Sequence, residues 1–231
     1  EGIYYDVDKV KEAGYTKDDL WKLTWNPTDG GTFEKFVAHM TVDKNGVRGD
    51  EPGFDKNHVD TYGLGFNDSG GGYGQTQWSA FALSTGWDYA DKNPWGVKWN
   101  YSDPRFKQTI QWYYSMIEKG YMPTLAQATS GVGSVDSFKA GAYATLLEGS
   151  WNANNLKTSS SKVQVMPTPI GPLGKRGSVV NSVGDSIYKG TPHPEEAWKF
   201  VKYMASAKCQ NKVADYAVVF PAISESSQRA V

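Results

Sequence analysis

The residues best suited to chemistry in this chain are aromatic and amide side chains that follow a predicted strand. Residues 143–147 form a short apolar run typical of a buried strand, and Trp151 comes shortly after its end. In open α/β sheets, ligands bind beyond the carboxyl ends of the strands. A Trp ring there could stack on the C–H face of a sugar, and Asn152, Asn154 and Asn155 could hydrogen-bond its hydroxyls. A core Trp that caps the next helix explains the pattern equally well.

Three other motifs resemble functional sites but lack part of the required chemistry. Asp6 and Asp8 follow a strand-like start, as in the nucleophile loop of haloacid-dehalogenase-type phosphatases, but no suitably placed acid pair follows. A helix start with two favourable acids explains them better. Residues 43–46 resemble part of a calcium loop whose twelfth position would be Pro52 instead of Glu. Residues 70–74 are glycine-rich but lack the Lys and Ser/Thr of a phosphate-binding loop.

No catalytic centre can be named from the sequence. His39, His58 and His193 are not spaced as a recognisable triad. Any two of the 25 acids could form the carboxylate pair of a glycosidase, because the separation of such a pair is set in space and not along the chain. A glycosidase therefore stays open as an alternative.

Composition argues against several classes of partner. The 231 residues include 24 basic and 25 acidic side chains, and this balance disfavours nucleic acid as a partner. No run approaches the ~20 consecutive apolar residues that span a bilayer. A single Cys209 cannot form an internal disulfide, and no Cys/His cluster has the spacing of a zinc site. We therefore expect no metal and no cofactor.

Strand-like and helix-like segments alternate along the chain, which predicts the α/β class. Asp103 and Pro104 begin the clearest helix, which Gly120 ends. Another helix begins near Thr191, and the helical spacing of its apolar residues predicts that they are buried. Those residues are Ala197, Phe200, Val201 and Met204. The expected strands are residues 2–5, 62–67, 143–147, 163–166 and 185–189, and the other expected helices include 7–13, 33–39, 75–84 and 135–139.

Five segments match one known family in the same order along the chain. Residues 138–152 read FKAGAYATLLEGSWN and resemble the F-x-x-G-x-A-A-M-x-x-x-G-x-W segment of bacterial extracellular solute-binding proteins of the maltose-binding-protein type. Asp6 stands where that family commonly has Asn. The other four segments are residues 3–14, 20–21, 165–172 and 183–206.

The resemblance implies a type II periplasmic-binding-protein-like α/β fold, in which two lobes enclose a ligand. The units that build most of the first lobe in that family have no counterpart in this sequence. We therefore expect residues 1–178 to form the second lobe, and residues 179–231 to form the hinge return and a partial first-lobe strand and helix. The sequence would then be a fragment of a longer protein.

By the same resemblance, we expect the substrate-binding component of an ABC importer, which captures a small carbohydrate, delivers it to a permease and is not an enzyme. Trp151 matches the family's stacking Trp, with Asn152 and Asn154 beside it. Further ligand contacts are expected where the cleft helix of the second lobe begins, at Tyr73, Gln75, Gln77 and Trp78. Asn181 and Asp185 lie near the return crossing between the lobes, where a hinge role is equally open.

The family also implies a place at the extracellular face of the membrane, held by a lipid anchor, or in the periplasm. Any signal peptide or anchoring Cys would lie upstream of this sequence. Besides a glycosidase, the second alternative is a stand-alone carbohydrate-binding module. Such modules are usually all-β, so the predicted α/β alternation disfavours that alternative.

Overall fold

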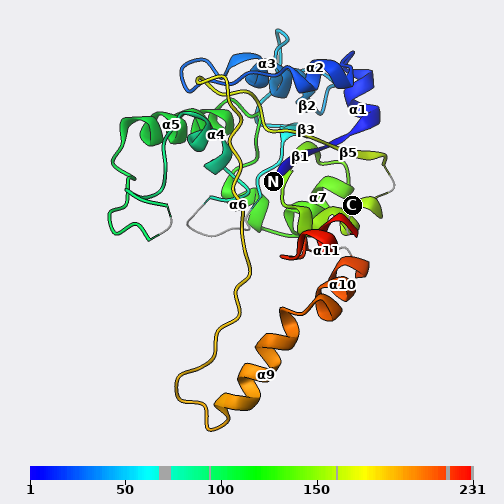
Figure 1. Cartoon of the computed structure of the whole chain (residues 1–231). Helices are drawn as coiled ribbons and strands as arrows, with labels where there is room; N and C mark the ends of the chain where they lie inside the picture. The colour runs from blue at the N-terminus through cyan, green and yellow to red at the C-terminus, as the bar shows by residue number, and fades with distance from the viewer. Residues whose placement is uncertain (68–73, 94, 160, 217–218, 230–231) are drawn as a thin grey trace. The chain divides into compact units, whose positions relative to one another are not determined.

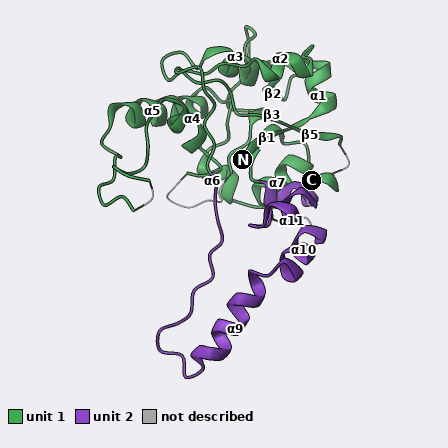
Figure 2. Ribbon diagram, in the orientation of Figure 1, with its two compact units in different colours: residues 1–149, 156–179 green, residues 150–155, 180–231 purple. Residues whose placement is uncertain are grey.

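The chain has a mixed α/β structure, given by a computed structural model that describes residues 1–67, 74–93, 95–159, 161–216 and 219–229 (Figure 1). It divides into two compact units (Figure 2). Unit 1 comprises residues 1–149 and 156–179, and unit 2 comprises residues 150–155 and 180–231. The sheet and most of the buried side chains belong to unit 1.

The sheet of unit 1 has five strands in the order β2-β3-β4-β1-β5. Strand β4 runs parallel to β3 and antiparallel to β1, so that Gly2 lies opposite Glu148. The carboxyl ends of β3 and β4 therefore meet at the edge where β1 begins. The strands are β1 (Gly2–Asp6), β2 (Val42–Asp43), β3 (Val59–Leu64), β4 (Tyr143–Glu148) and β5 (Val163–Met166). The predicted strands 2–5, 143–147 and 163–166 are confirmed, whereas β3 begins and ends earlier than predicted.

Helices cover both faces of the sheet, because β4 is buried along its whole length and needs apolar cover on each side (Figure 1). On one face, α3 packs on β3 over a core that includes Phe33 and Phe36; on the other, α7 packs on β4 around Phe138 and Leu146. The helices with residues in unit 1 are α1 (Val7–Glu12), α2 (Lys17–Trp21), α3 (Gly31–Met40), α4 (Ser79–Ser84), α5 (Pro104–Glu118), α6 (Leu125–Thr129), α7 (Ser134–Lys139) and the last two residues of α8 (Ala153–Lys157).

Capping by Asp side chains explains where two of these helices begin. Asp6 Oδ1 accepts hydrogen bonds from Asp8 N at 2.9 Å and Lys9 N at 3.2 Å at the start of α1. Asp103 caps α5 in the same way, with Pro104 at the first helical position. The acids of the phosphatase-like motif thus serve a helix start, as the simpler interpretation predicted.

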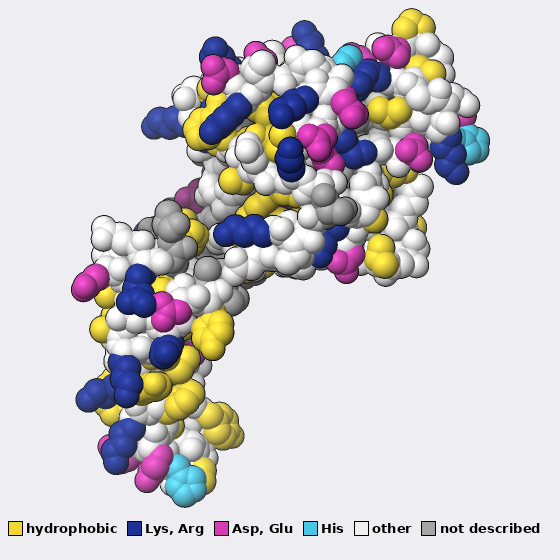
Figure 3. Space-filling model, turned by 90° about the vertical axis from the view of Figure 1, so that its right-hand side faces the viewer, with side chains coloured by type: hydrophobic (Ala, Val, Ile, Leu, Met, Phe, Trp, Pro, Cys, Tyr) yellow, Lys and Arg dark blue, Asp and Glu magenta, His cyan; other side chains and the backbone are white. Residues whose placement is uncertain are grey.

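Unit 2 contains α9 (Pro194–Met204), α10 (Ala207–Tyr216) and α11 (Ser224–Arg229). Two predictions are wrong here. Residues 185–189 are exposed and irregular instead of forming a strand, since no described segment pairs with their backbone. The apolar face of α9 is not buried: Phe200 is 63% exposed, because unit 2 has no sheet of its own to cover it. Figure 3 shows apolar side chains exposed among lysines over this part of the chain.

Candidate functional site

A buried acid and a buried amide meet at the edge of the sheet where β3 and β4 end. Glu148 is 1% exposed, and its carboxylate accepts hydrogen bonds from Gly149 N and Asn67 Nδ2, each at 2.7 Å. Asn67 follows β3 and is fully buried, and its Oδ1 accepts a hydrogen bond from Ser134 Oγ at 3.2 Å. Burial of a carboxylate is unfavourable unless donors satisfy it, as they do here. These two side chains are therefore held in fixed positions.

The Glu1 carboxyl group lies close to this pair. Its Oε2 accepts a hydrogen bond from Val179 N at 3.3 Å. Burial raises the pKa of Glu1 to about 7, and the neighbouring Glu148 carboxylate adds to the rise. Near neutral pH this carboxyl group can therefore donate a hydrogen bond as well as accept one.

Two glutamines from the segment before α4 complete a polar cluster, which we define as Glu1, Asn67, Gln75, Gln77 and Glu148. Gln77 Nε2 donates to Asn67 O at 2.6 Å and so fixes the chain that leaves β3. Gln75 is 8% exposed, and the Glu1 carboxyl group lies near enough for hydrogen bonding with the Gln75 side chain to lower the pKa of Glu1. An amide donates two hydrogen bonds, so Gln75 can serve Glu1 and an incoming oxygen atom together.

Trp78 comes immediately before α4 and belongs to a ring cluster, which we define as Trp78, Trp87, Tyr89, Tyr101 and Phe106. The Trp78 ring centroid lies 5.0 Å from that of Phe106 and 6.0 Å from that of Trp87, both edge-on. Rings packed in this way are held rigidly. Burial raises the pKa of Tyr89 to about 12; a hydrogen bond with the Ser79 side chain opposes this rise, and the Glu1 charge adds to it.

The other predicted site residues of the described chain lie in unit 2. Trp151 and Asn152 are half-buried in a single 3₁₀ turn, Ser150–Asn152, directly after β4. Asn154, in α8, donates from Nδ2 to Tyr216 O at 3.0 Å, so its amide takes part in the packing of unit 2 itself. Two further candidates are exposed in the irregular stretch before α9, Asn181 and Asp185.

The structure thus brings Gln75, Gln77 and Trp78 together in unit 1, while Tyr73 lies outside the described residues. Sequence reasoning missed Asn67 and Glu148 as site residues. Each carries a usable signal, because a polar residue at or shortly after the carboxyl end of a strand lies at the edge where ligands bind: Glu148 is the last residue of β4, and Asn67 comes three residues after β3. The hydrogen bond between them depends on the parallel pairing of β3 and β4, which the sequence does not reveal.

These side chains offer hydrogen bonds and flat rings. Among the described residues, no group of three or more His, Cys, Asp and Glu could hold a metal ion. Both Glu148 oxygens accept hydrogen bonds from protein N–H groups, an arrangement that positions a carboxylate for structure. The arrangement as a whole suits a ligand with many hydroxyl groups and apolar ring faces.

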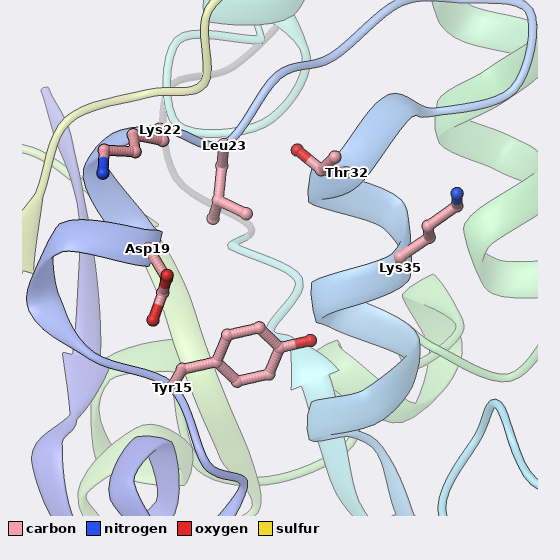
Figure 4. A pocket seen from close by; sticks show the side chains of 6 residues that line it. All are labelled: Tyr15, Asp19, Lys22, Leu23, Thr32 and Lys35. Atoms are coloured by element: carbon pink, nitrogen blue, oxygen red, sulfur yellow. The ribbon is translucent and has the colours of Figure 1, made fainter.

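A separate surface pocket of about 340 Å³ lies between α2 and α3 (Figure 4). The Tyr15 ring points between the helices, whereas the ammonium groups of Lys22 and Lys35 point to opposite sides (Figure 4). Its polar groups therefore do not converge on one position. Its lining contains none of the predicted site residues and consists of Tyr15, Asp19, Lys22, Leu23, Thr32 and Lys35.

Comparison with known proteins supplies an independent line of evidence. The sequence model of the bacterial extracellular solute-binding protein family matches residues 1–231. A comparison with curated protein sequences finds no match. Among the described residues, no helix combines the length and the apolar character that crossing a bilayer requires.

Several solved structures share the fold. UspC from M. tuberculosis is 18% identical with a TM-score of 0.73 over 99% of this chain and 56% of its own. Lmo0181 from Listeria monocytogenes, in complex with cycloalternan, is 16% identical with a TM-score of 0.69 over 99% of this chain and 52% of its own. The maltose/maltodextrin-binding domain MalE from Bdellovibrio bacteriovorus, bound to maltotriose, is 21% identical with a TM-score of 0.66. The match covers 98% of this chain and 53% of the MalE chain. The chain thus spans about half the length of these structures.

Proposed function

Because this chain belongs to the bacterial extracellular solute-binding protein family, we propose that it captures a carbohydrate and delivers it to the permease of an ABC importer. Two of the proteins with the same fold were solved with an oligosaccharide, cycloalternan or maltotriose. We further propose that the protein acts outside the cytoplasmic membrane, free in the periplasm or held by a lipid anchor. The family itself is described as extracellular, which supports this location.

The observation that carries the proposal is the polar cluster beside the ring cluster in unit 1. A sugar presents hydroxyl groups at its edges and C–H groups on its faces, so it needs hydrogen-bonding groups next to a flat apolar surface. Gln75 supplies a buried donor, Glu1 an acid that can donate or accept, and Trp78 a fixed ring. The contacts that hold these groups are made by the protein itself, so little ordering is needed on binding.

Trp151 is the residue that we propose as a second stacking surface. It follows the carboxyl end of a buried strand, and its side chain is partly exposed. Its segment also matches the family pattern. Asn152 lies next to it and supplies an amide that can donate to and accept from hydroxyl groups.

We propose binding without catalysis. A glycosidase needs a carboxylic acid and a carboxylate on either side of the bond that it breaks. In unit 1 the Glu148 carboxylate is held by the Gly149 and Asn67 N–H groups, which favours a positioning role for this acid. Family membership supports the same conclusion.

Thermal unfolding in the presence of solutes tests the proposal. Saccharides should raise the melting temperature of the chain, whereas matched amino acids, short peptides and glycerol should not, because a ligand that binds only the folded state stabilises it. Stabilisation by peptides or amino acids in place of saccharides would contradict the proposed ligand class.

A Trp151→Ala variant tests the proposed role of that ring. We expect affinity for the stabilising saccharide to fall by about tenfold to a hundredfold, which corresponds to stacking worth about 1–3 kcal/mol. A core Trp would instead lose about 3–5 kcal/mol of unfolding free energy. Trp21→Ala, which removes a more exposed Trp on α2 outside the proposed site, is the control. Loss of stability with unchanged affinity would contradict the assignment.

A further inference from the structure

Residues 88–91 and 97–101 of unit 1 are joined by hydrogen bonds, and this pair of segments, which we call the hairpin, presents a ring to solvent. Ala90 and Trp99 face each other across an antiparallel bridge. The Asp91 carboxylate closes the hairpin, since its Oδ1 accepts hydrogen bonds from Val97 N at 3.0 Å and Lys98 N at 3.2 Å. A loop fixed by hydrogen bonds on both sides of a residue holds that residue's backbone in one place.

The base of the hairpin is tied to the ring cluster. Asn100 N donates to Tyr89 O at 2.9 Å, and Asn100 O accepts a hydrogen bond from Trp87 Nε1 at 2.9 Å. Asn100 Nδ2 donates to Asp88 O at 3.1 Å. Asn100, the neighbour of Trp99, is therefore held by hydrogen bonds of both its backbone and its side chain. These bonds fix the backbone of Trp99 relative to the ring cluster.

The Trp99 ring continues the ring cluster outward. Its plane lies within 25° of that of Tyr101, with the centroids 6.1 Å apart, and Tyr101 lies edge-on to Trp78 at 6.4 Å. Trp99 is nevertheless 54% exposed and Tyr101 37% exposed. Leaving such a large apolar ring in water forgoes the free energy of its burial. A ring that is both rigid and exposed is typical of a stacking surface for a ligand.

We propose that Trp99, braced by Tyr101, is an outer stacking subsite for a further sugar ring of the ligand bound at Trp78 and the polar cluster. This inference rests on the proposed function and refines it, because it makes the substrate an oligosaccharide. The series of rings from Trp78 through Tyr101 to Trp99 supports it, because each further sugar unit of a longer ligand could stack on the next ring of the series. The anchored hairpin means that the subsite exists before the ligand arrives.

Calorimetric titration with two series of saccharides tests the subsite. The probes are glucose, maltose, maltotriose and maltotetraose, and mannose, mannobiose and mannotriose. We expect the affinity of the unchanged chain to rise with the number of sugar units in the series that binds. In Trp99→Ala the gain for the longer members should disappear, with a loss of about tenfold or more for them and little change for the shorter ones. Trp99→Phe, which keeps a flat ring, should recover part of the gain.

Two comparisons make the result specific. Trp21→Ala removes a Trp of similar exposure, 48%, from α2 and should leave the whole series unchanged. Because Trp99 is exposed, Trp99→Ala should unfold at nearly the same temperature as the unchanged chain. Equal affinity losses for all lengths, or no loss at any length, would overturn the outer subsite while leaving carbohydrate binding intact. Failure of every saccharide to bind the unchanged chain would instead overturn the proposed function and the subsite with it.

Discussion

Trp78 can occupy its place only because the residue four positions earlier has no side chain. Gly74 has φ of +59°, in the left-handed region, and a Cβ there would lie 2.0 Å from Trp78 Cε2. The absence of a side chain at Gly74 therefore has a steric purpose. It lets the Trp78 ring close over the backbone and reach the ring cluster.

We predict that Gly74→Ala destabilises the chain and moves the Trp78 ring. The left-handed conformation alone costs a non-glycine residue about 1–2 kcal/mol, and the clash should add about 1–3 kcal/mol. Gly46→Ala is the matched control, since Gly46 has φ of +84° with no atom within 4 Å of the added Cβ. Denaturant unfolding measures both variants. Equal losses in the two would show that Trp78 does not press on Gly74.

The Glu1 carboxyl group predicts a dependence of stability on pH. Burial raises its pKa in the folded chain to about 7, so the folded state holds this proton more tightly than the unfolded state does. The resulting stability is present below the ordinary Glu pKa and is lost as pH rises through about 7. Glu1→Gln should therefore melt higher than the unchanged chain at pH 8, with a smaller difference at pH 4.5. Glu12→Gln, at an exposed acid, is the control, and a difference independent of pH would contradict the prediction.

At the scale of elements, one carboxylate organises the long turn between β2 and β3. Asp43 is 1% exposed; its Oδ1 accepts hydrogen bonds from Asn45 N and Val47 N, and its Oδ2 accepts one from Asp55 N at 2.9 Å. The resemblance to a calcium loop thus has a structural explanation. The acid binds backbone N–H groups of its own loop in place of a cation.

We predict that Asp43→Asn loosens this turn. The Asn side chain would have one NH2 group in place of a carboxylate oxygen, and this group cannot accept the hydrogen bond that a backbone N–H now donates to that oxygen. The donors, Asp55 N first among them, hold the pKa of Asp43 below its usual range. Its contribution to stability is therefore present above the ordinary Asp pKa and is lost as pH falls through the lowered value. Hydrogen exchange of the Val47 and Asp55 amides measures the effect, with Asp60→Asn on β3 as the control. Unchanged exchange would contradict the role given to Asp43.

Sequence patterns predicted elements well where the signal is local. Asp103 with Pro104 marked the start of α5, and the apolar run at 143–147 marked β4. The helix predicted over residues 75–84 begins only at Ser79, because the left-handed Gly74 sets a turn ahead of it. Pairing is not a local property, so the sequence could identify Gln75 and Trp78 as candidates but not the hydrogen bond from Asn67 to Glu148.

At the scale of the molecule, the two units differ in how much they bury. Unit 1 has two apolar clusters on its sheet, whereas α9 in unit 2 has no buried residue. The exposed apolar residues of α9 are Trp198, Phe200 and Tyr203. The irregular stretch before this helix also leaves backbone groups exposed, and such groups pair readily with another chain. The surface of unit 2 is therefore the part of this chain most suited to contact with other polypeptide.

We predict that this chain self-associates through unit 2 as its concentration rises, because an exposed apolar patch lowers its free energy by burial. Light scattering over a range of concentrations measures the association. Phe200→Ser should weaken it, whereas Tyr114→Ser, at a comparably exposed ring on α5, should not. A strict monomer at every concentration would contradict the prediction.

The most direct test of carbohydrate capture follows the indole N–H signals of the chain by nuclear magnetic resonance during titration with maltotriose and mannotriose. We predict saturable shifts of the Trp78 and Trp151 signals with at least one of these sugars, since a sugar that stacks on a ring changes its magnetic surroundings. The Trp21 signal, on α2, should stay in place. Shifts confined to Trp21, or no saturable shift with any saccharide at millimolar concentration, would contradict the account.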